Sequence, residues 1–230
     1  MFVARRRDGS VRGVICFGAQ VVLAADDAGA LDAFAQETRR HPAIVSFVGS
    51  KRTVDAFWAR VRSWHRAPSL VRERQPLYAV WPAALLPAPD VAVRLARVDE
   101  TPVVATNSAQ MILGELGYDP RAQRASFIAG VRRAIEAGWW WVWEVDGEVR
   151  FQCNVGARTP LTAQIQGVWT PPALRGRGYA SQGLAAVSRA LLETNPTLSL
   201  YVNDFNTTAI ALYERIGYQR VGELTTYIFS

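Results

Sequence analysis

The residues best suited to chemistry form a glycine-rich loop, Arg175-Gly176-Arg177-Gly178-Tyr179-Ala180-Ser181. It follows an apparent strand and opens an apparent helix. The first amides of a helix have no internal partners and lie at the positive end of its dipole, so together they favour a phosphate group. Glycine lets a ligand approach the backbone, and arginine adds forked donors for phosphate oxygens. The loop therefore predicts an anion site, and the alternative is an ordinary strand-to-helix turn.

A second glycine with a predicted backbone role is Gly167, near the end of the strand expected over residues 161–169. A glycine inside a strand marks either a bulge or a close approach of another backbone. A bulge would free an amide for a ligand, whereas close packing would serve only the fold. The sequence leaves both interpretations open.

The elements that must position these residues follow from hydrophobic periodicity and turn signals in the second half of the chain. Asp146-Gly147 indicates a hairpin, and Gly217 indicates the end of a helix that begins after Asn206. The expected order is strand, helix, helix, three strands, helix, strand, helix and strand, at residues 91–98, 101–116, 121–137, 139–145, 149–155, 161–169, 179–194, 198–202, 206–216 and 221–229.

Two segments within this order resemble the GCN5-related N-acetyltransferase (GNAT) family. Arg175-x-x-Gly178-x-Ala180 is similar to the family's pyrophosphate loop, Gln/Arg-x-x-Gly-x-Gly/Ala, between its fourth strand and third helix. Asn206-x-x-Ala209-x-x-Leu212-Tyr213-x-x-x-Gly217-Tyr218 is similar to the family's Asn-x-x-Ala-x-x-Leu-Tyr-x-x-x-Gly-Phe segment after the fifth strand. The resemblance covers residues 91–230 and implies a mixed α/β sheet with the acyl-CoA N-acyltransferase fold.

The resemblance implies that acetyl-CoA is the acyl donor and that no metal is needed. In the family the fourth and fifth strands splay apart, and pantetheine pairs with the open edge like an extra strand. A bulge at Gly167 would begin that splay. The residues that this expectation assigns to the cofactor are Gly167, Val168, Trp169, Arg175, Gly176, Arg177, Gly178, Tyr179, Ala180, Ser181, Asn203 and Asn206.

Tyr213 is the expected proton donor in the same framework. The leaving thiolate of CoA needs a proton, because a free thiol titrates near pKa ~8.5. A phenol with a pKa of ~10 is largely protonated at neutral pH and can donate. The alternative is a tyrosine that only packs in the core.

The base that removes a proton from the amine is harder to assign. Many family members use a glutamate on the fourth strand, where this chain has Gln164 and Gln166 instead. Glu144, on a neighbouring strand, is the candidate base, and the other nearby carboxylates are Glu115 and Glu148. Each is otherwise a surface carboxylate, and water alone could serve an acceptor of low pKa.

The first half of the chain carries no recognisable chemical motif. Its expected elements are strands at 2–6, 11–17, 20–24, 44–48 and 70–81 and helices at 27–39 and 53–64. Three prolines, Pro82, Pro87 and Pro89, indicate a stiff linker. We expect two domains, 1–85 and 86–230, the first a small α/β domain that could be a degenerate duplicate without a cofactor site.

Composition excludes several classes of protein. Half of the 230 residues are hydrophobic and 20% are charged, which is typical of a packed globular chain. No apolar run approaches the roughly 20 residues that span a bilayer. Cys16 and Cys153 are too few for a disulfide framework. We therefore expect a cytoplasmic protein without membrane contact.

The net charge is +6, but the basic residues are scattered among acids, which argues against nucleic-acid binding. The expected function is acetyl transfer from acetyl-CoA to a primary amine of a small molecule or protein, by a monomer or homodimer. One alternative is an acyl-CoA-binding sensor or interaction module without turnover. Another is a nucleic-acid-binding protein that uses the arginines of the glycine-rich loop.

Overall fold

The computed structural model describes residues 1–18, 20–41, 43–117 and 119–229 as a mixed α/β protein with two compact units. Unit 1 comprises Met1–Leu77, Tyr201–Asn206 and the stretch from Val221 onward, and unit 2 comprises Tyr78–Leu200 and Thr207–Arg220. The expected domains, 1–85 and 86–230, remain a prediction. The units differ from them because two strands, β5 (Leu70–Val80) and β11 (Gln219–Ile228), each run from one unit into the other.

Unit 1 contains strands in the order β1-β2-β3-β4-β11. The pairs β1/β2, β2/β3 and β4/β11 are antiparallel, and β3/β4 is parallel. Phe34, Phe47 and Phe57 lie in its buried core. The elements are β1 (Phe2–Arg5), β2 (Val11–Cys16), β3 (Gln20–Ala25), α1 (Ala28–Thr38), β4 (Ser46–Ser50) and α2 (Lys51–Val61).

The strands of unit 2 follow the order β10-β9-β8-β7-β6. All these neighbours are antiparallel except β9 and β10, which run parallel. Parallel neighbours need a crossover element, and α5 provides it. The strands are β6 (Val93–Leu95), β7 (Trp140–Val145), β8 (Glu148–Arg158), β9 (Thr162–Trp169) and β10 (Thr197–Tyr201).

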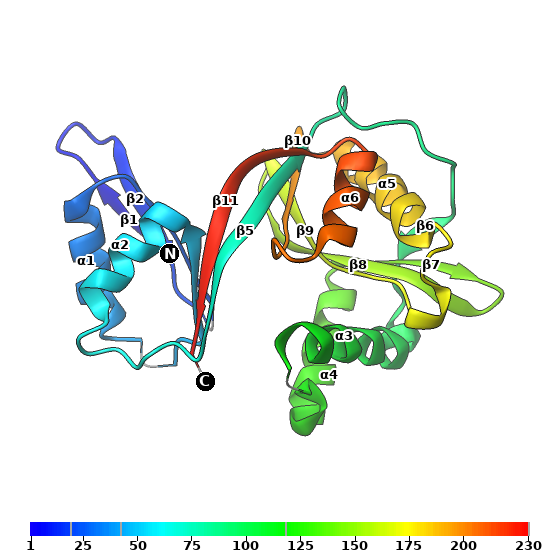
Figure 1. Ribbon diagram of the computed structural model, residues 1–230, viewed down its shortest axis with the longest axis horizontal. Helices are drawn as coiled ribbons and strands as arrows, with labels where there is room; N and C mark the ends of the chain where they lie inside the picture. Colours follow the sequence, from blue (N-terminus) through cyan, green and yellow to red (C-terminus); the bar gives the residue numbers. More distant parts are fainter. Residues whose placement is uncertain (19, 42, 118, 230) are drawn as a thin grey trace. The chain divides into compact units, whose positions relative to one another are not determined.

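Four helices cover the two faces of the sheet in unit 2. As Figure 1 shows, α3 and α4 lie on one face, and α5 and α6 lie on the other. On the first face, Val104, Val131, Ile135 and Trp140 form a buried cluster. On the second, a Cβ at Gly183 would lie 2.5 Å from the ring of Phe151, so glycine lets α5 pack closely on β8. The helices are α3 (Thr101–Leu116), α4 (Arg124–Glu136), α5 (Tyr179–Leu192) and α6 (Thr207–Arg215).

The expected elements are present, with one clear difference in extent. The strand expected over 91–98 is reduced to β6, and a 3-10 turn, η1 (Val98–Glu100), follows it. Two further 3-10 turns, η2 (Pro120–Gln123) and η3 (Pro172–Leu174), precede α4 and α5. Among the described residues, no helix combines the length and apolarity needed to cross a membrane.

Candidate functional site

The register between β8 and β9 places a bulge at Gly167. Gln152 pairs with Trp169, and Asn154 pairs with Gln166. The two pairs are two residues apart on β8 but three residues apart on β9, so β9 contains one extra residue. The extra residue falls at 167–168, where Gly167 has φ +65°. A Cβ at this position would lie 2.5 Å from Asn154 Oδ1. Both the left-handed backbone conformation and the close approach of Asn154 therefore require glycine at position 167. Glycine is the residue expected at a bulge of this kind.

The parallel pair β9/β10 comes apart just before this bulge. The two strands pair at Thr162/Thr197, Ala163/Leu198 and Gln164/Ser199. β9 then continues for five residues, 165–169, that have no paired residue on β10 in the described chain. Unpaired backbone of this kind can accept an extended ligand as an additional strand.

The glycine-rich loop reverses the chain between η3 and α5. Gly176 and Gly178 have φ +77° and +83°, in the left-handed region. Gly178 occupies the N-cap position of α5, and no side chain caps the first turn. Residues 175–178 are exposed, and Arg177 is among them. The amides of the first turn of α5 are thus available to an anion, which is the arrangement that the loop sequence predicts.

Arg175 connects this loop to the end of β9. Its Nε donates to the carbonyl oxygen of Thr170 at 3.2 Å, and its guanidinium carbon lies 4.5 Å from the ring centroid of Trp169. Trp169 Nε1 and Thr170 Oγ1 are both buried without a hydrogen-bond partner among the described residues. A buried unsatisfied polar atom costs about 1–3 kcal/mol. Two of them beside an exposed anion-binding turn indicate a place that a ligand or water completes.

The three residues at the start of α5 have different surroundings. The hydroxyl of Tyr179 accepts a hydrogen bond from Arg150 Nη1 on β8, and its ring packs edge-on against Trp143. The side chain of Tyr179 therefore joins α5 to strands β7 and β8, which leaves its backbone amide as the group that could serve the loop. Ser181 Oγ donates to the carbonyl oxygen of Gly178 at 2.9 Å, and Ala180 is half-buried.

Tyr213 lies on α6 with 7% of its surface exposed. Burial, the charge of Glu115 and the nearby Cys153 all raise its pKa, so the phenol keeps its proton at neutral pH. The rings of Tyr78 and Tyr218 flank it with centroids at 6.2 Å. A protonated phenol is what a donor to a leaving thiolate requires.

Glu115 is a carboxylate whose importance the sequence does not reveal. It lies near the end of α3 and is exposed, and α3 lies on the opposite face of the sheet from α6. Its charge nevertheless acts on Tyr213. A negative charge disfavours the tyrosinate form, so Glu115 contributes to the raised pKa of Tyr213.

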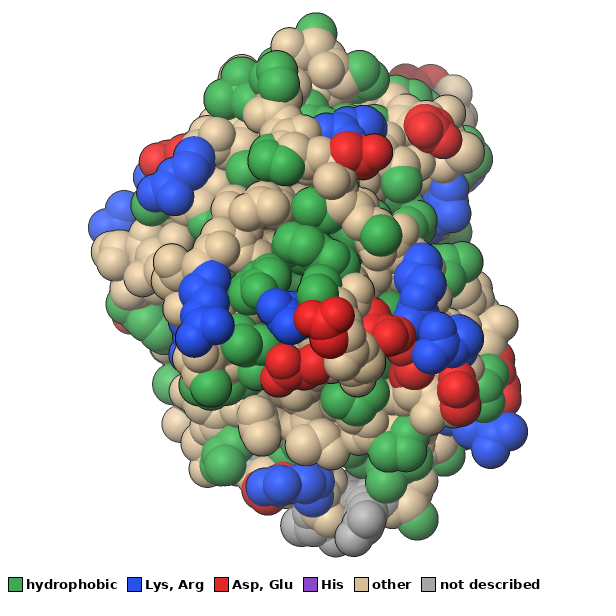
Figure 2. Space-filling view, turned by 90° about the vertical axis from the view of Figure 1, so that its right-hand side faces the viewer, with side chains coloured by type: hydrophobic (Ala, Val, Ile, Leu, Met, Phe, Trp, Pro, Cys, Tyr) green, Lys and Arg blue, Asp and Glu red, His purple; other side chains and the backbone are tan. Residues whose placement is uncertain are grey.

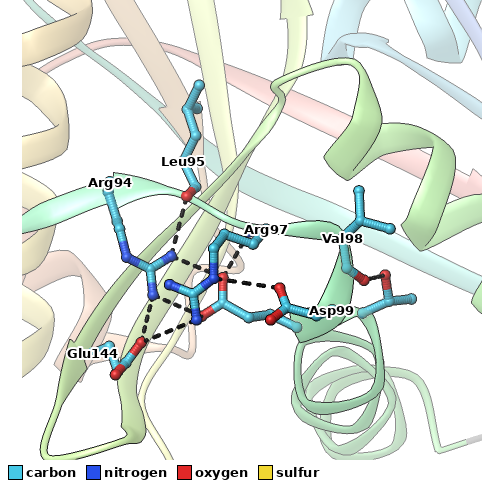
Figure 3. A network of polar contacts seen from close by, with 8 residues as sticks. Arg94, Leu95, Arg97, Val98, Asp99 and Glu144 are labelled. Atoms are coloured by element: carbon cyan, nitrogen blue, oxygen red, sulfur yellow. Dashed lines mark hydrogen bonds and ion pairs between the residues drawn. The ribbon is translucent and has the colours of Figure 1, made fainter.

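Glu144, the candidate base from the sequence, lies in an ion-pair network on β7. Figure 3 shows Arg94 between Glu144 and η1, with Arg97 beside it. Arg94 donates to both carboxylate oxygens of Glu100 at 2.8 Å and to Glu144, and Arg97 Nη2 lies 3.7 Å from Glu144. These guanidinium groups already engage the carboxylate of Glu144. The network ties β6 and η1 to β7, and the role of Glu144 as base remains a prediction.

Asn203 and Asn206, assigned to the cofactor by the sequence, belong to unit 1 by their contacts. Asn203 is buried, and its Oδ1 accepts from Gln75 Nε2 at 3.1 Å, while Gln75 Oε1 accepts from Thr226. The backbone amide of Asn206 donates to the carbonyl oxygen of Asn203, and α6 begins directly after it. Their cofactor roles remain predictions. No group of three or more His, Cys, Asp or Glu among the described residues could hold a metal ion.

Comparison with protein families gives two matches. The model for the family described as "FR47-like protein" matches residues 155–228, which include the bulge, the loop and Tyr213. The model for the family described as "Domain of unknown function (DUF4081)" matches residues 1–104. A search of curated proteins found no match.

Solved structures resemble the chain over nearly its full length. An acetyltransferase of the GNAT family from Colwellia psychrerythraea is 11% identical, with 98% of this chain and 84% of that chain covered and a TM-score of 0.62. A GCN5-related N-acetyltransferase from Kribbella flavida is 16% identical, with 92% and 81% covered and a TM-score of 0.61. A tandem GNAT protein from the clavulanic acid biosynthesis pathway is 11% identical, with 97% and 81% covered and a TM-score of 0.55. At these identities the likeness is one of fold.

Proposed function

We propose that this chain, whose fold is that of the GCN5-related N-acetyltransferases, transfers an acetyl group from acetyl-CoA to a primary amine. The observation that carries the proposal is the continuity of one stretch, 165–181. It joins the unpaired edge of β9, the Gly167 bulge and the uncapped start of α5. These three features suit an extended thioester that ends in a pyrophosphate.

The pyrophosphate would be held by the loop. Backbone amides from Gly176 to Ser181 would donate to its oxygens, and Arg177 would add charge. The pantetheine arm would lie along the open edge of β9, and an amide freed at Gly167–Val168 would donate to the thioester oxygen.

The chemistry is a direct displacement. The amine nitrogen attacks the thioester carbon, a carbon–nitrogen bond forms, and the carbon–sulfur bond breaks with its electron pair on sulfur. Tyr213 would give its proton to that sulfur, because its raised pKa keeps it protonated. The products are an amide and free CoA. The nitrogen loses one proton as the amide forms, and Tyr213 regains from solvent the proton that it gave to sulfur.

We assign Glu115 as the base that accepts the proton lost by the amine. It is exposed on the face of α3 and α4, opposite the face on which Tyr213 lies, so acceptor and thiolate would be served from opposite sides of the sheet. It would accept the proton directly or through water. An exposed carboxylate here also favours the binding of a cationic amine over a neutral or anionic acceptor. Such an amine must first lose a proton, to Glu115 or water, before its nitrogen can attack.

The charges on the face shown in Figure 2 give no support to nucleic-acid binding. On the face in Figure 2, Lys and Arg side chains stand beside Asp and Glu side chains around an apolar area. A nucleic-acid interface usually presents a continuous basic stripe. Arg175, in the loop, is engaged by Thr170 and Trp169.

The experiment that tests the proposal is calorimetric titration with acetyl-CoA. The wild type should bind in the micromolar range, and Gly178→Trp should not bind, because it blocks the first turn of α5. Gly147→Trp is the matched control. Gly147 also has a positive φ, and no atom lies within 4 Å of the point where its Cβ would stand, but it belongs to the β7–β8 turn.

Turnover is then measured as release of free thiol in the presence of simple primary amines. Binding together with amine-dependent thiol release would support the acetyltransferase. Binding without release from any amine would favour the acyl-CoA sensor. Absence of binding to the wild type would overturn the proposal.

A further inference from the structure

Unit 1 repeats the architecture that carries the candidate site in unit 2. In unit 1 the order is β1-β2-β3-α1-β4-α2, and in unit 2 it is β7-β8-β9-α5-β10-α6. In both, three antiparallel strands are followed by a parallel pair that is joined at three positions among the described residues. The pairs in unit 1 are Gln20/Ser46, Val21/Phe47 and Val22/Val48. The turn from β3 into α1 therefore corresponds to the glycine-rich loop before α5.

The turn in unit 1 carries an acid where unit 2 carries glycines. Only Asp26 and Asp27 separate β3 from α1. Asp27 is the N-cap of α1, and its Oδ1 accepts from the amide of Ala30 at 3.0 Å. Arg12 on β2 donates to the other oxygen of the same carboxylate. One carboxylate thus engages both a helix N-terminus and a guanidinium group, the two donors that a phosphate would use.

Asp27 is held as an anion by these contacts. The amide of Ala30 is the largest influence that lowers its pKa, followed by Arg12. The carboxylate is therefore charged at neutral pH. Arg12 Nη2 donates to Asp27, whereas Arg12 Nε is buried without a hydrogen-bond partner among the described residues.

The strand edge of unit 1 is also occupied. A Cβ at Gly49 would lie 2.4 Å from the carbonyl oxygen of Leu23, so β4 stays against β3 beyond their last pair. At the end of β3, Thr53 Oγ1 of α2 donates to the carbonyl oxygen of Ala25 at 3.0 Å. The end of β3 corresponds to the open edge of β9. In unit 1, β4 and α2 cover this edge.

We propose that unit 1 is a second copy of the acyl-CoA-binding arrangement in which the chain's own groups take the ligand's place. The Asp27 carboxylate stands where a phosphate would bind, and Gly49 and Thr53 close the strand edge. The chain consequently binds one acyl-CoA, in unit 2. This inference rests on the proposed function and adds its stoichiometry and the role of unit 1.

The first test is the stoichiometry of acetyl-CoA binding by calorimetry on the full chain. One equivalent per chain is expected, and Gly178→Trp should abolish it. Two equivalents, or one that survives in Gly178→Trp, would overturn the inference while leaving acyl-CoA binding itself intact. No binding at all would overturn the proposed function instead, so the two failures are distinguishable.

The second test removes the internal anion in the Gly178→Trp background, where unit 2 is blocked. Asp27→Gly frees the first amides of α1 and leaves Arg12 in place, and Asp26→Gly is the matched control because Asp26 does not cap the helix. With inorganic pyrophosphate as the probe, Asp27→Gly should gain measurable binding and a raised melting temperature. Equal responses of the two folded variants would overturn the inference. The wild-type stoichiometry decides the matter if Asp27→Gly does not fold.

Discussion

The amide oxygen of Asn154 lies 2.5 Å from the point where a Cβ on residue 167 would stand. Asn154 therefore fills the space beside Gly167, on the side of β9 that faces β8. Gly167 also has φ +65°, so the backbone is constrained by conformation and by its neighbour at once. The bulge directs the end of β9 away from regular pairing, next to the stretch that β10 leaves unpaired.

Gly167→Ala should weaken both the fold and the site. An L-residue in the left-handed region costs about 1–2 kcal/mol, and Asn154 must also move. We expect a loss of stability of about that size in urea unfolding and at least a tenfold loss of acetyl-CoA affinity by calorimetry. Gly156→Ala on β8 is the control, because the three atoms nearest to its Cβ all belong to the end of the Gln166 side chain, which can rotate. Unchanged affinity in Gly167→Ala would show that the bulge does not serve the cofactor.

Tyr213→Phe should lower kcat and leave the KM for acetyl-CoA unchanged. The substitution keeps the ring in its buried position and removes only the proton donor. General acid catalysis contributes roughly 100-fold or more, so a loss of about that size is expected in thiol-release assays. Because burial raises the pKa of Tyr213, the wild-type rate should not fall as the pH rises through the ordinary tyrosine range near ~10.

Tyr218→Phe is the matched control for Tyr213. Tyr218 is also a buried tyrosine, and its hydroxyl bonds to Ser188 Oγ at 2.9 Å. Its loss should cost about 1 kcal/mol of stability and leave kcat near the wild-type value. Equal rates in all three proteins would remove Tyr213 from the mechanism.

Glu115→Gln and Glu144→Gln distinguish the two candidate bases. If Glu115 accepts the proton, Glu115→Gln should lower kcat/KM by about 100-fold and remove the acidic limb of the pH–rate profile. Glu144→Gln should change the rate little, since its carboxylate is engaged by Arg94 and Arg97. The opposite pattern would return the role of base to Glu144. A loss in neither variant would leave water as the proton acceptor.

The sequence predicted the parts of the fold that local chemistry determines. Asp146-Gly147 forms the expected hairpin turn, with both residues at positive φ, and the helix that follows Gly178 begins at Tyr179. The sequence left a bulge and a close approach both open at Gly167, and the structure has both of them there. Two motifs in the correct order predicted the fold of the second half.

What the sequence could not predict depends on partners far along the chain. The strand expected over 91–98 ends at Leu95 because the carboxylate of Glu100 accepts the amide of Arg97 at 2.6 Å and turns the backbone into η1. Asn203 is bonded to Gln75, more than a hundred residues away. Periodicity carries no information about such pairings.

The Arg94–Glu100 pair yields a prediction about stability that is independent of catalysis. Glu100 is 8% exposed, and Arg94, followed by the amide of Arg97, lowers its pKa below the ordinary value of 4.5. A lowered carboxyl pKa stabilises the fold above the unfolded-state pKa, and the contribution is lost as the pH falls through the folded-state value. Breaking a buried ion pair on one side typically costs about 3 kcal/mol.

Glu100→Gln should therefore lower the free energy of unfolding by about 3 kcal/mol at pH 7, measured in urea. The deficit should shrink as the pH falls below 4.5, because the wild type then loses the same interaction by protonation. Glu136→Gln is the control. Its exposed pair with Arg132 on α4 should contribute less than about 0.5 kcal/mol at either pH. The loss in free energy of unfolding caused by Glu100→Gln could instead stay constant down to the pH at which the protein unfolds. Packing of the side chain, and not its charge, would then explain how Glu100 stabilises the junction of β6 and η1.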